Sequence, residues 1–78
     1  MVRDSEHLVD IVASARLIST YVAGIRREQF LKDTRLQDSV IRRLEIIGEA
    51  AGRLSPEFRE RHPEIPWSAM TGIATTRT

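Results

Sequence analysis

The sequence contains no cysteine and few residues that interrupt a helix or fill a large core: three prolines, four glycines, one tryptophan, one tyrosine and two phenylalanines in 78 residues. The missing cysteine excludes disulfide bridges and cysteine-ligated zinc. A chain of this length buries only about 60% of the surface that its unfolded form exposes, so such chains usually need a disulfide, a metal or a partner. We therefore expect one thin-cored domain that relies on helix packing or association.

The sequence also lacks an excess of charge of either sign and any long apolar run. Twelve basic residues face eleven acidic ones, so the net charge is +1, which is not the basic footprint typical of a nucleic-acid-binding domain. No apolar run approaches the roughly 20 residues of a membrane span. Residues 1–6 do not resemble a secretory signal. We expect a cytoplasmic protein with no membrane association.

The spacing of apolar residues predicts a first helix over residues 5–23. Asp4 or Ser5 can cap its start, and Gly24 follows its end, where glycine is common. The residues expected to form its buried stripe recur every three or four positions. They are Leu8, Ile11, Val12, Ala15, Ile18 and Val22.

A second long helix is predicted over residues 35–54, with Thr34 as its cap. Its apolar face is too wide for a helix covered on one side only, which indicates packing on two sides, against its own domain and against a partner. Gly48 and Gly52 indicate either close approach of another backbone or glycines that are simply tolerated. The interface predicted on this helix comprises Val40, Leu44, Ile47, Gly48, Ala51 and Gly52.

Shorter elements are predicted around these two helices. Residues 26–32 form a helical turn, and Ser55 caps a helix over 56–61, which ends before Pro63. A further helix starts at Pro66, but the pattern is lost after Gly72. The expected organisation is an all-α, small antiparallel helical bundle over residues 1–72, followed by a disordered tail over 73–78.

The residues that could carry chemistry form no convincing constellation. Neither His7 nor His62 has a second histidine or an acid at metal-ligand spacing, so we predict no metal site and no cofactor, and expect both to be exposed or capping. Glu45 and Glu49 lie one helical turn apart, among arginines that favour a solvated ion-pair face over acid–base chemistry. Trp67 is interpreted as a core anchor. No catalytic residue is predicted.

Three runs of sequence carry a resemblance to a known family. Residues 36–51 read LQDSVIRRLEIIGEAA, residues 53–58 read RLSPEF and residues 62–67 read HPEIPW. These runs resemble the HepT-like family (DUF86) of the HEPN superfamily. Together with the preceding helix and the turn at 30–33, the resemblance covers residues 5–72. It implies a helical, dimeric, metal-independent ribonuclease toxin, whose MntA-like nucleotidyltransferase antitoxin transfers AMP to a toxin tyrosine.

The resemblance further implies catalysis by an Arg-x(4)-His-x-Tyr motif in the helix after Pro66-Trp67. There the arginine would hold the scissile phosphate and the histidine would act as general acid or base. In this sequence Arg77 has no histidine after it, and Tyr21 does not match the AMP-accepting tyrosine. We therefore expect that C-terminal helix or helices of the family are missing, through truncation or a frameshift after Gly72, and that the chain is inactive.

Two interpretations follow. The first is a HepT-like toxin component by descent, in which intact members act on RNA. The alternative is a non-catalytic helical interaction module that forms a homodimer, or binds the antitoxin or an intact toxin. In either case we expect low stability and partial exposure of Val40, Leu44 and Ile47 or their neighbours, because a covering helix would be absent.

Overall fold

The computed structural model describes residues 3–76 of the chain, with side chains described for residues 3–72. The described part is all helical and contains no strand, as the sequence predicted. Its helices are α1 (Asp4–Val22), α2 (Arg27–Lys32), α3 (Thr34–Gly52), α4 (Pro56–Arg61) and α5 (Trp67–Thr76).

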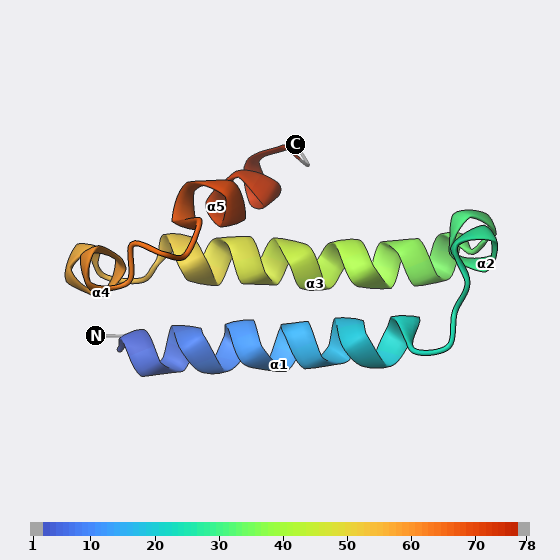
Figure 1. Cartoon of the computed structure of the whole chain (residues 1–78), viewed down its shortest axis with the longest axis horizontal. Helices are drawn as coiled ribbons and strands as arrows, with labels where there is room; N and C mark the ends of the chain where they lie inside the picture. Colours follow the sequence, from blue (N-terminus) through green and yellow to red (C-terminus); the bar gives the residue numbers. More distant parts are fainter. Residues whose placement is uncertain (1–2, 77–78) are drawn as a thin grey trace.

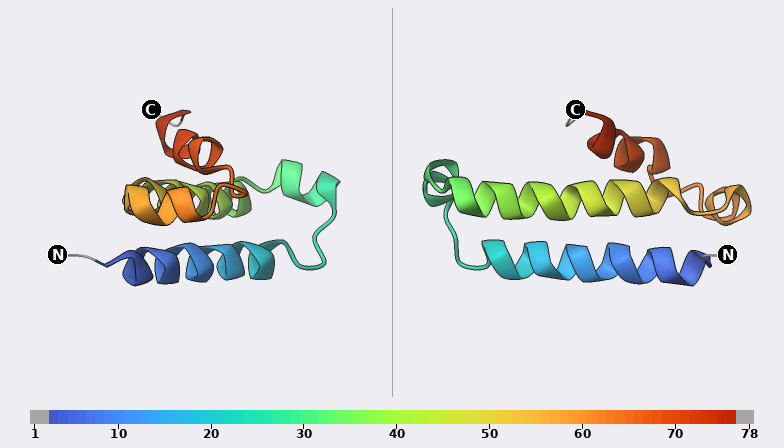
Figure 2. Two further views of the ribbon diagram at one scale, coloured as in Figure 1. Left: turned by 60° about the vertical axis from the view of Figure 1, so that its left-hand side comes forward. Right: turned by 180° about the vertical axis from the view of Figure 1, so that it is seen from behind.

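Helix α3 is the central element of the bundle. Helix α1 runs antiparallel along one side of α3, and α5 packs on the other side (Figure 1). The two further views show the same layering, with α2 and α4 at opposite ends of α3 (Figure 2). The buried hydrophobic side chains come from α3 and the residues just after it. They are Val40, Ile47, Ala50, Ala51 and Leu54.

The connection between α1 and α3 is built from a glycine turn and a side-chain cap. Gly24 follows the end of α1 with a φ of 72°, a left-handed conformation that favours glycine, as the sequence predicted. The cap of α3 is Asp33 and not Thr34, because the Asp33 carboxylate accepts a hydrogen bond from the Leu36 backbone N–H at 3.0 Å. The Gln37 side chain donates to the Phe30 carbonyl at 2.9 Å and thereby ties α2 to α3.

The C-terminal part of the fold differs from the expected tail. The helix that starts after Pro66 continues through Thr76. The expected loss of helical structure after Gly72 is therefore wrong for residues 73–76. Because α5 lies against α3, tertiary packing can support a segment with poor intrinsic helix propensity. Within this helix the Thr71 hydroxyl donates to the Ser68 carbonyl at 3.1 Å. Residues 77 and 78, the end of the predicted tail, lie outside the described residues.

Candidate functional site

The interface predicted on α3 lies largely inside the chain. Val40 and Ile47 are each 9% exposed and Ala51 is 0% exposed, while Gly48 is also buried. Leu44 is half-buried, and Gly52 is exposed at the end of the helix. Helix α3 packs on two sides within the chain, against α1 and α5, whereas the predicted contact of α3 with a partner stays a prediction.

The expected exposure of this set is correspondingly wrong for Val40 and Ile47, which are buried. Gly52 is also not forced to be glycine by a close backbone. A Cβ atom there would lie 3.5 Å from the Thr71 side chain, which is an ordinary van der Waals distance. Of the two interpretations of Gly52, a glycine that is simply tolerated agrees with the structure.

Helix α1 is rotated about its axis relative to the sequence prediction, so a different stripe of its side chains faces α3. The buried residues of α1 are His7 and Ser14, which are 7% and 1% exposed. Of the predicted stripe, Leu8, Ile11 and Ile18 are half-buried, whereas the other three members are exposed. Those exposed members are Val12, Ala15 and Val22.

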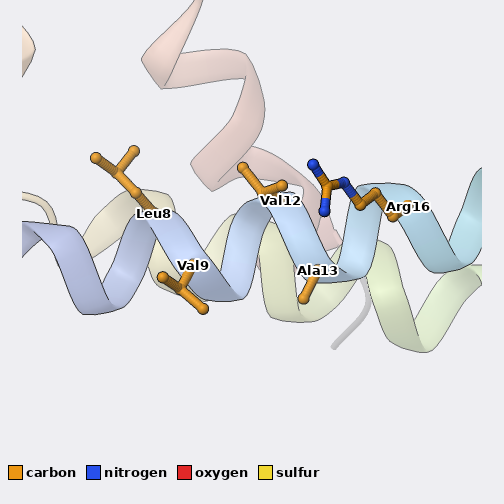
Figure 3. Close-up of a pocket in the computed structure, with 5 residues that line it drawn as sticks. All are labelled: Leu8, Val9, Val12, Ala13 and Arg16. Atoms are coloured by element: carbon orange, nitrogen blue, oxygen red, sulfur yellow. The ribbon is translucent and has the colours of Figure 1, made fainter.

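The outward side of α1 is an open apolar face. Val9 is 65% exposed, Val12 46% and Leu17 37%. A shallow groove on this face is lined by Leu8, Val9, Val12, Ala13 and Arg16, all from α1 (Figure 3). A second depression continues it along the helix and shares Val12 and Arg16. We call the surface formed by Val9, Val12, Ala13, Arg16 and Leu17 the outer α1 face.

The Asp4 carboxylate at the start of α1 hydrogen-bonds to Ser55 at the start of α4, and it does not cap α1. Asp4 accepts hydrogen bonds from the Ser55 backbone N–H at 2.9 Å and from the Ser55 hydroxyl at 2.6 Å. The same hydroxyl accepts from the Phe58 N–H at 3.1 Å and caps α4. The predicted cap of α1 by Asp4 or Ser5 is thus wrong, because the cap position is Arg3 without a side-chain hydrogen bond.

These hydrogen bonds also set the protonation of the carboxyl group. The Ser55 hydroxyl, and next the Ser55 backbone N–H, lower the pKa of Asp4 below its ordinary value of 3.8, because both stabilise the charged form. Nearby His7 and Arg61 lower it further by electrostatic attraction, against a desolvation that raises it. The contact joins residues 51 positions apart and closes the open end of the α1–α3 pair.

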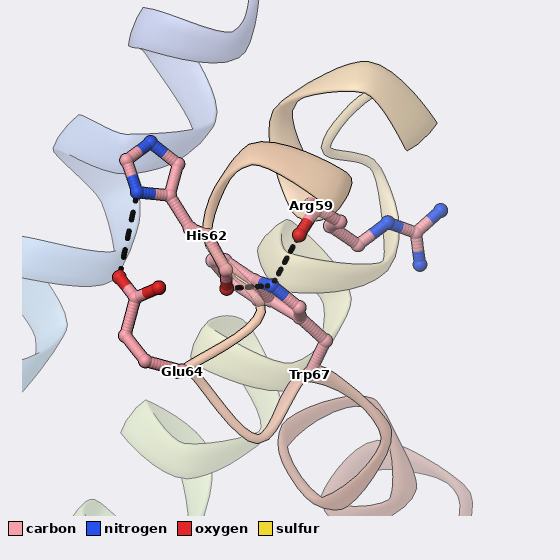
Figure 4. A network of polar contacts seen from close by, with 4 residues as sticks. All are labelled: Arg59, His62, Glu64 and Trp67. Atoms are coloured by element: carbon pink, nitrogen blue, oxygen red, sulfur yellow. Dashed lines mark hydrogen bonds and ion pairs between the residues drawn. The ribbon is translucent and has the colours of Figure 1, made fainter.

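A second polar network fixes the end of α4 (Figure 4). The Trp67 indole N–H donates to the carbonyls of Arg59 at 3.2 Å and His62 at 3.0 Å, each of which also accepts a backbone N–H in the turn that ends α4. Phe58 lies beside both rings, with ring centroids 4.6 Å from His62 and 6.0 Å from Trp67. Trp67 is half-buried and lies outside the buried core, so it anchors the end of α4 and does not fill the core as the sequence interpretation had it.

The histidines do not form a site together. His7 is buried in α1, so the expectation of an exposed or capping residue is wrong there, whereas His62 is half-buried at the C-cap of α4. His62 Nδ1 lies 3.5 Å from a carboxylate oxygen of Glu64. Within the described residues no group of three or more histidines and acids could hold a metal ion. Glu45 is half-buried and Glu49 exposed, and their solvated ion-pair face stays a prediction.

The stripe of α1 that faces the bundle is not the most apolar one in the sequence. Asp4, His7, Ile11, Ser14, Ile18 and Tyr21 are spaced three or four apart and form a continuous helical stripe, which is the stripe that faces the bundle. Because half of these residues are polar, a pattern based on apolar residues alone selects the neighbouring stripe.

Fold and site together define a small all-α bundle with an uncovered apolar helix face and no catalytic constellation assembled among the described residues. Comparison with protein families gives the more specific assignment. A family model for ribonuclease HepT-like proteins matches residues 11–74. The chain belongs to the HepT-like family.

Individual relatives agree with this assignment. The chain is 45% identical over 65 residues to a Thermococcus cleftensis protein named "Probable ribonuclease HepT", covering 83% of this chain and 59% of that one. It is 40% identical over 67 residues to a Caldanaerobacter subterraneus protein whose name suggests an RNase, covering 86% of this chain and 60% of that one. A Methanocaldococcus jannaschii protein, whose name suggests both a gamma-glutamylcyclotransferase and an RNase, is 46% identical over 61 residues, or 78% of this chain and 28% of that one.

The chain therefore spans about three-fifths of the length of the first two relatives. No solved structure matches the chain. Among the described residues, no helix combines the length and apolar character that a bilayer crossing requires.

Proposed function

We propose that this chain is the HepT-like component of a type VII toxin–antitoxin system in the cytoplasm. The family activity is metal-independent RNA cleavage, which AMP transfer from an MntA-like nucleotidyltransferase neutralises. The observation that carries this proposal is the family match over residues 11–74, together with relatives named for ribonuclease activity.

We further propose that the 78-residue chain does not cleave RNA by itself. The Arg-x(4)-His-x-Tyr pattern occurs nowhere in the sequence. His62, the more accessible of the two histidines, contacts Phe58 and Glu64 and is not preceded by an arginine at the required spacing. Without a general acid or base beside a phosphate-binding arginine, the usual source of rate enhancement for this reaction is missing.

The alternative function is that of a non-catalytic helical interaction module that forms a homodimer, or binds the antitoxin or an intact toxin. The outer α1 face favours it, because contiguous exposed apolar side chains on a small protein mark interaction sites. This alternative involves binding without catalysis, so binding and RNA-cleavage assays distinguish the two functions.

The test is incubation of the purified 78-residue chain with structured and unstructured RNA, with and without EDTA. We expect no cleavage above a buffer control in either condition. Cleavage that resists EDTA and co-purifies with the protein through a second column would overturn the proposed inactivity. A His62→Ala variant serves as the matched control, because cleavage by a contaminating nuclease would persist in it.

The partner is tested by titrating an MntA-like nucleotidyltransferase into the labelled chain. Binding, with or without AMP transfer, supports a role in the toxin–antitoxin pair. Absence of both binding and AMP transfer, with a full-length relative as the positive control, would contradict that role for this chain.

A further inference from the structure

The outer α1 face is an exposed apolar surface to which the fold assigns no role. Val9 is 65% exposed and Val12 46%, although α1 buries its opposite side against α3. Two shallow depressions on this side of α1 share Val12 and Arg16, and together they extend from Leu8 to Thr20. At a helical rise of about 1.5 Å per residue, they form one groove roughly 18 Å long.

The groove has the form that accepts another helix. Leu8, Val12 and Arg16 project along one border, and Val9 and Ala13 along the other (Figure 3). Side chains spaced four residues apart form ridges between which the ridges of a second helix pack, at interaxial distances of about 8–10 Å. Every lining residue belongs to α1, so the groove has no opposite wall to enclose a small molecule, whereas small-molecule sites bury most of their ligand. A helix of about three turns matches its length.

Arg16 is an exposed cation in this apolar groove, and it contributes to both depressions. Its guanidinium group lies beside Val12 (Figure 3). Among the residues whose side chains the structure describes, none forms an ion pair with Arg16. Asp10, the nearest acid in α1, lies six residues earlier, beyond the three- and four-residue spacing at which helix side chains pair. The charge of Arg16 is therefore available to a group from outside the chain.

A partner that fits this groove must combine apolar side chains with an anion. A helix that covers Val9 and Val12 also removes Arg16 from water, and an unpaired buried charge is costly, so the helix has to bring a carboxylate to the guanidinium group. An RNA backbone also brings anions, but phosphate binding relies on clustered cations, and Arg16 is the one arginine or lysine in α1. Charge complementarity therefore favours an acidic amphipathic helix over a nucleic acid.

We propose that the outer α1 face binds an amphipathic helix of another protein, with aliphatic side chains over Val9 and Val12 and an aspartate or glutamate paired with Arg16. This recognition rests on the interaction role within the proposed function, and it adds the chemistry of the partner. The valines supply the apolar contact, and the arginine sets the preference for an acidic helix over a basic one.

The chemistry of the partner is tested with a display library of amphipathic helices of about 15 residues, which have leucines at three- and four-residue spacing and one randomised position within the apolar stripe. The full chain and its Arg16→Glu variant each serve as the target. We expect the unchanged chain to enrich aspartate and glutamate at that position about fivefold over lysine and arginine, and the variant to reverse the preference. Selection of no helix, or of the same residues by both targets, would overturn the proposal.

Fluorescence anisotropy then measures the affinity of the selected acidic helix. Arg16→Glu should weaken its binding about tenfold, and a lysine in place of the acid of the helix should restore binding to this variant to within about threefold. Purely additive losses in the combined change would contradict a pairing with Arg16. Circular dichroism shows whether each variant keeps its helices.

The apolar part of the surface is tested in the same assay. Val9→Lys combined with Val12→Lys is expected to abolish detectable binding. The matched control is Leu31→Lys on α2, because Leu31 is 61% exposed and lies outside the outer α1 face. A helix that still binds the valine variant, or that loses binding with the leucine change, would refute the assigned surface.

Two other occupants of the face give different results. Displacement of the bound helix by an equal concentration of single-stranded RNA would assign the face to RNA. Sedimentation equilibrium without the helix, showing a dimer that the two valine changes disrupt, would assign it to a second copy, and either result would overturn the proposal. RNA cleavage and AMP transfer, which test the proposed function, are not measured here, so failure of the acidic helix to bind leaves that function separately testable.

Discussion

Helices α1 and α3 are equal in length, 19 residues each, and pack antiparallel, yet they bury different kinds of surface. Helix α3 packs on two sides and buries two aliphatic side chains and three small residues. Helix α1 buries a histidine and a serine and turns valines outward. A helix that packs on two sides must follow its apolar pattern, whereas a helix that packs on one side can be oriented by a few polar contacts.

For α1 those polar contacts are at its first turn. Asp4 is held by both the backbone and the hydroxyl of Ser55, at 2.9 and 2.6 Å. A charge-assisted hydrogen bond is roughly twice as strong as a neutral one, and this pair fixes the rotation of the helix about its axis. Once Asp4 faces the bundle, the residues at three- and four-residue spacing from it must face the bundle as well.

The largest expected difference in unfolding free energy comes from truncating one aliphatic side chain that packs with α3 and one that is exposed on α1. Leu54→Ala, directly after α3 and 2% exposed, should lose about 2–5 kcal/mol and leave little cooperative unfolding. Val9→Ala on the outer α1 face should change the free energy of unfolding by less than about 0.5 kcal/mol. Urea denaturation followed by circular dichroism, at concentrations where the chain is monomeric, measures both. Equal losses would erase the distinction between the helices.

The small buried serine of α1 gives the next contrast. Ser14 is 1% exposed, so Ser14→Leu inserts a larger side chain between α1 and α3 and should cost about 1–3 kcal/mol. Ser19→Leu, on the exposed side of the same helix, is the matched control and should be close to neutral. A larger loss of unfolding free energy for Ser19→Leu than for Ser14→Leu would contradict the orientation of α1 in the bundle.

The Asp4 contact predicts a pH dependence. Because the folded pKa of Asp4 lies below its ordinary value of 3.8, its stabilising contribution is fully present above that value. It is lost as the pH falls through the lowered folded pKa. Asp4→Asn should therefore remove part of the loss of unfolding free energy that accompanies this fall in pH, and Asp38→Asn, at an exposed position of α3, is the comparison variant. Identical acid profiles for the two variants would exclude the Ser55 contact as the cause.

The smallest expected effects concern two glycines with opposite requirements. Gly52→Ala should stabilise the chain by up to about 1 kcal/mol, since the added Cβ atom finds an ordinary contact 3.5 Å from Thr71. Gly24→Ala should destabilise it by about 1 kcal/mol, because the φ of 72° is unfavourable for alanine. Thermal melts of the two variants check the signs, and the same sign for both would contradict the assigned backbone.

Much of the fold could be predicted from the sequence because its signals are local. Ser55-Pro56-Glu57 starts α4, Gly24 ends α1, and the wide apolar pattern between residues 35 and 54 gives α3 two packed sides. The family could be predicted for the same reason, since the matching runs are continuous stretches of α3, α4 and the segment before α5.

The orientation of α1 and the identity of the open face could not be predicted in this way. They depend on a contact between Asp4 and Ser55, 51 residues apart, which no local pattern records. The continuation of α5 to Thr76 depends likewise on packing against α3 and not on the propensities of its threonines and glycine. In both cases tertiary contacts override a local preference.

Hydroxyl-radical footprinting of the chain, read by mass spectrometry over a range of protein concentrations, tests the central contrast most directly. At low concentration Val9, Val12 and Leu17 should label strongly while Val40, Ile47 and Leu54 stay protected. Protection of Val9 and Val12 at every dilution, or strong labelling of Val40 and Ile47, would contradict the account.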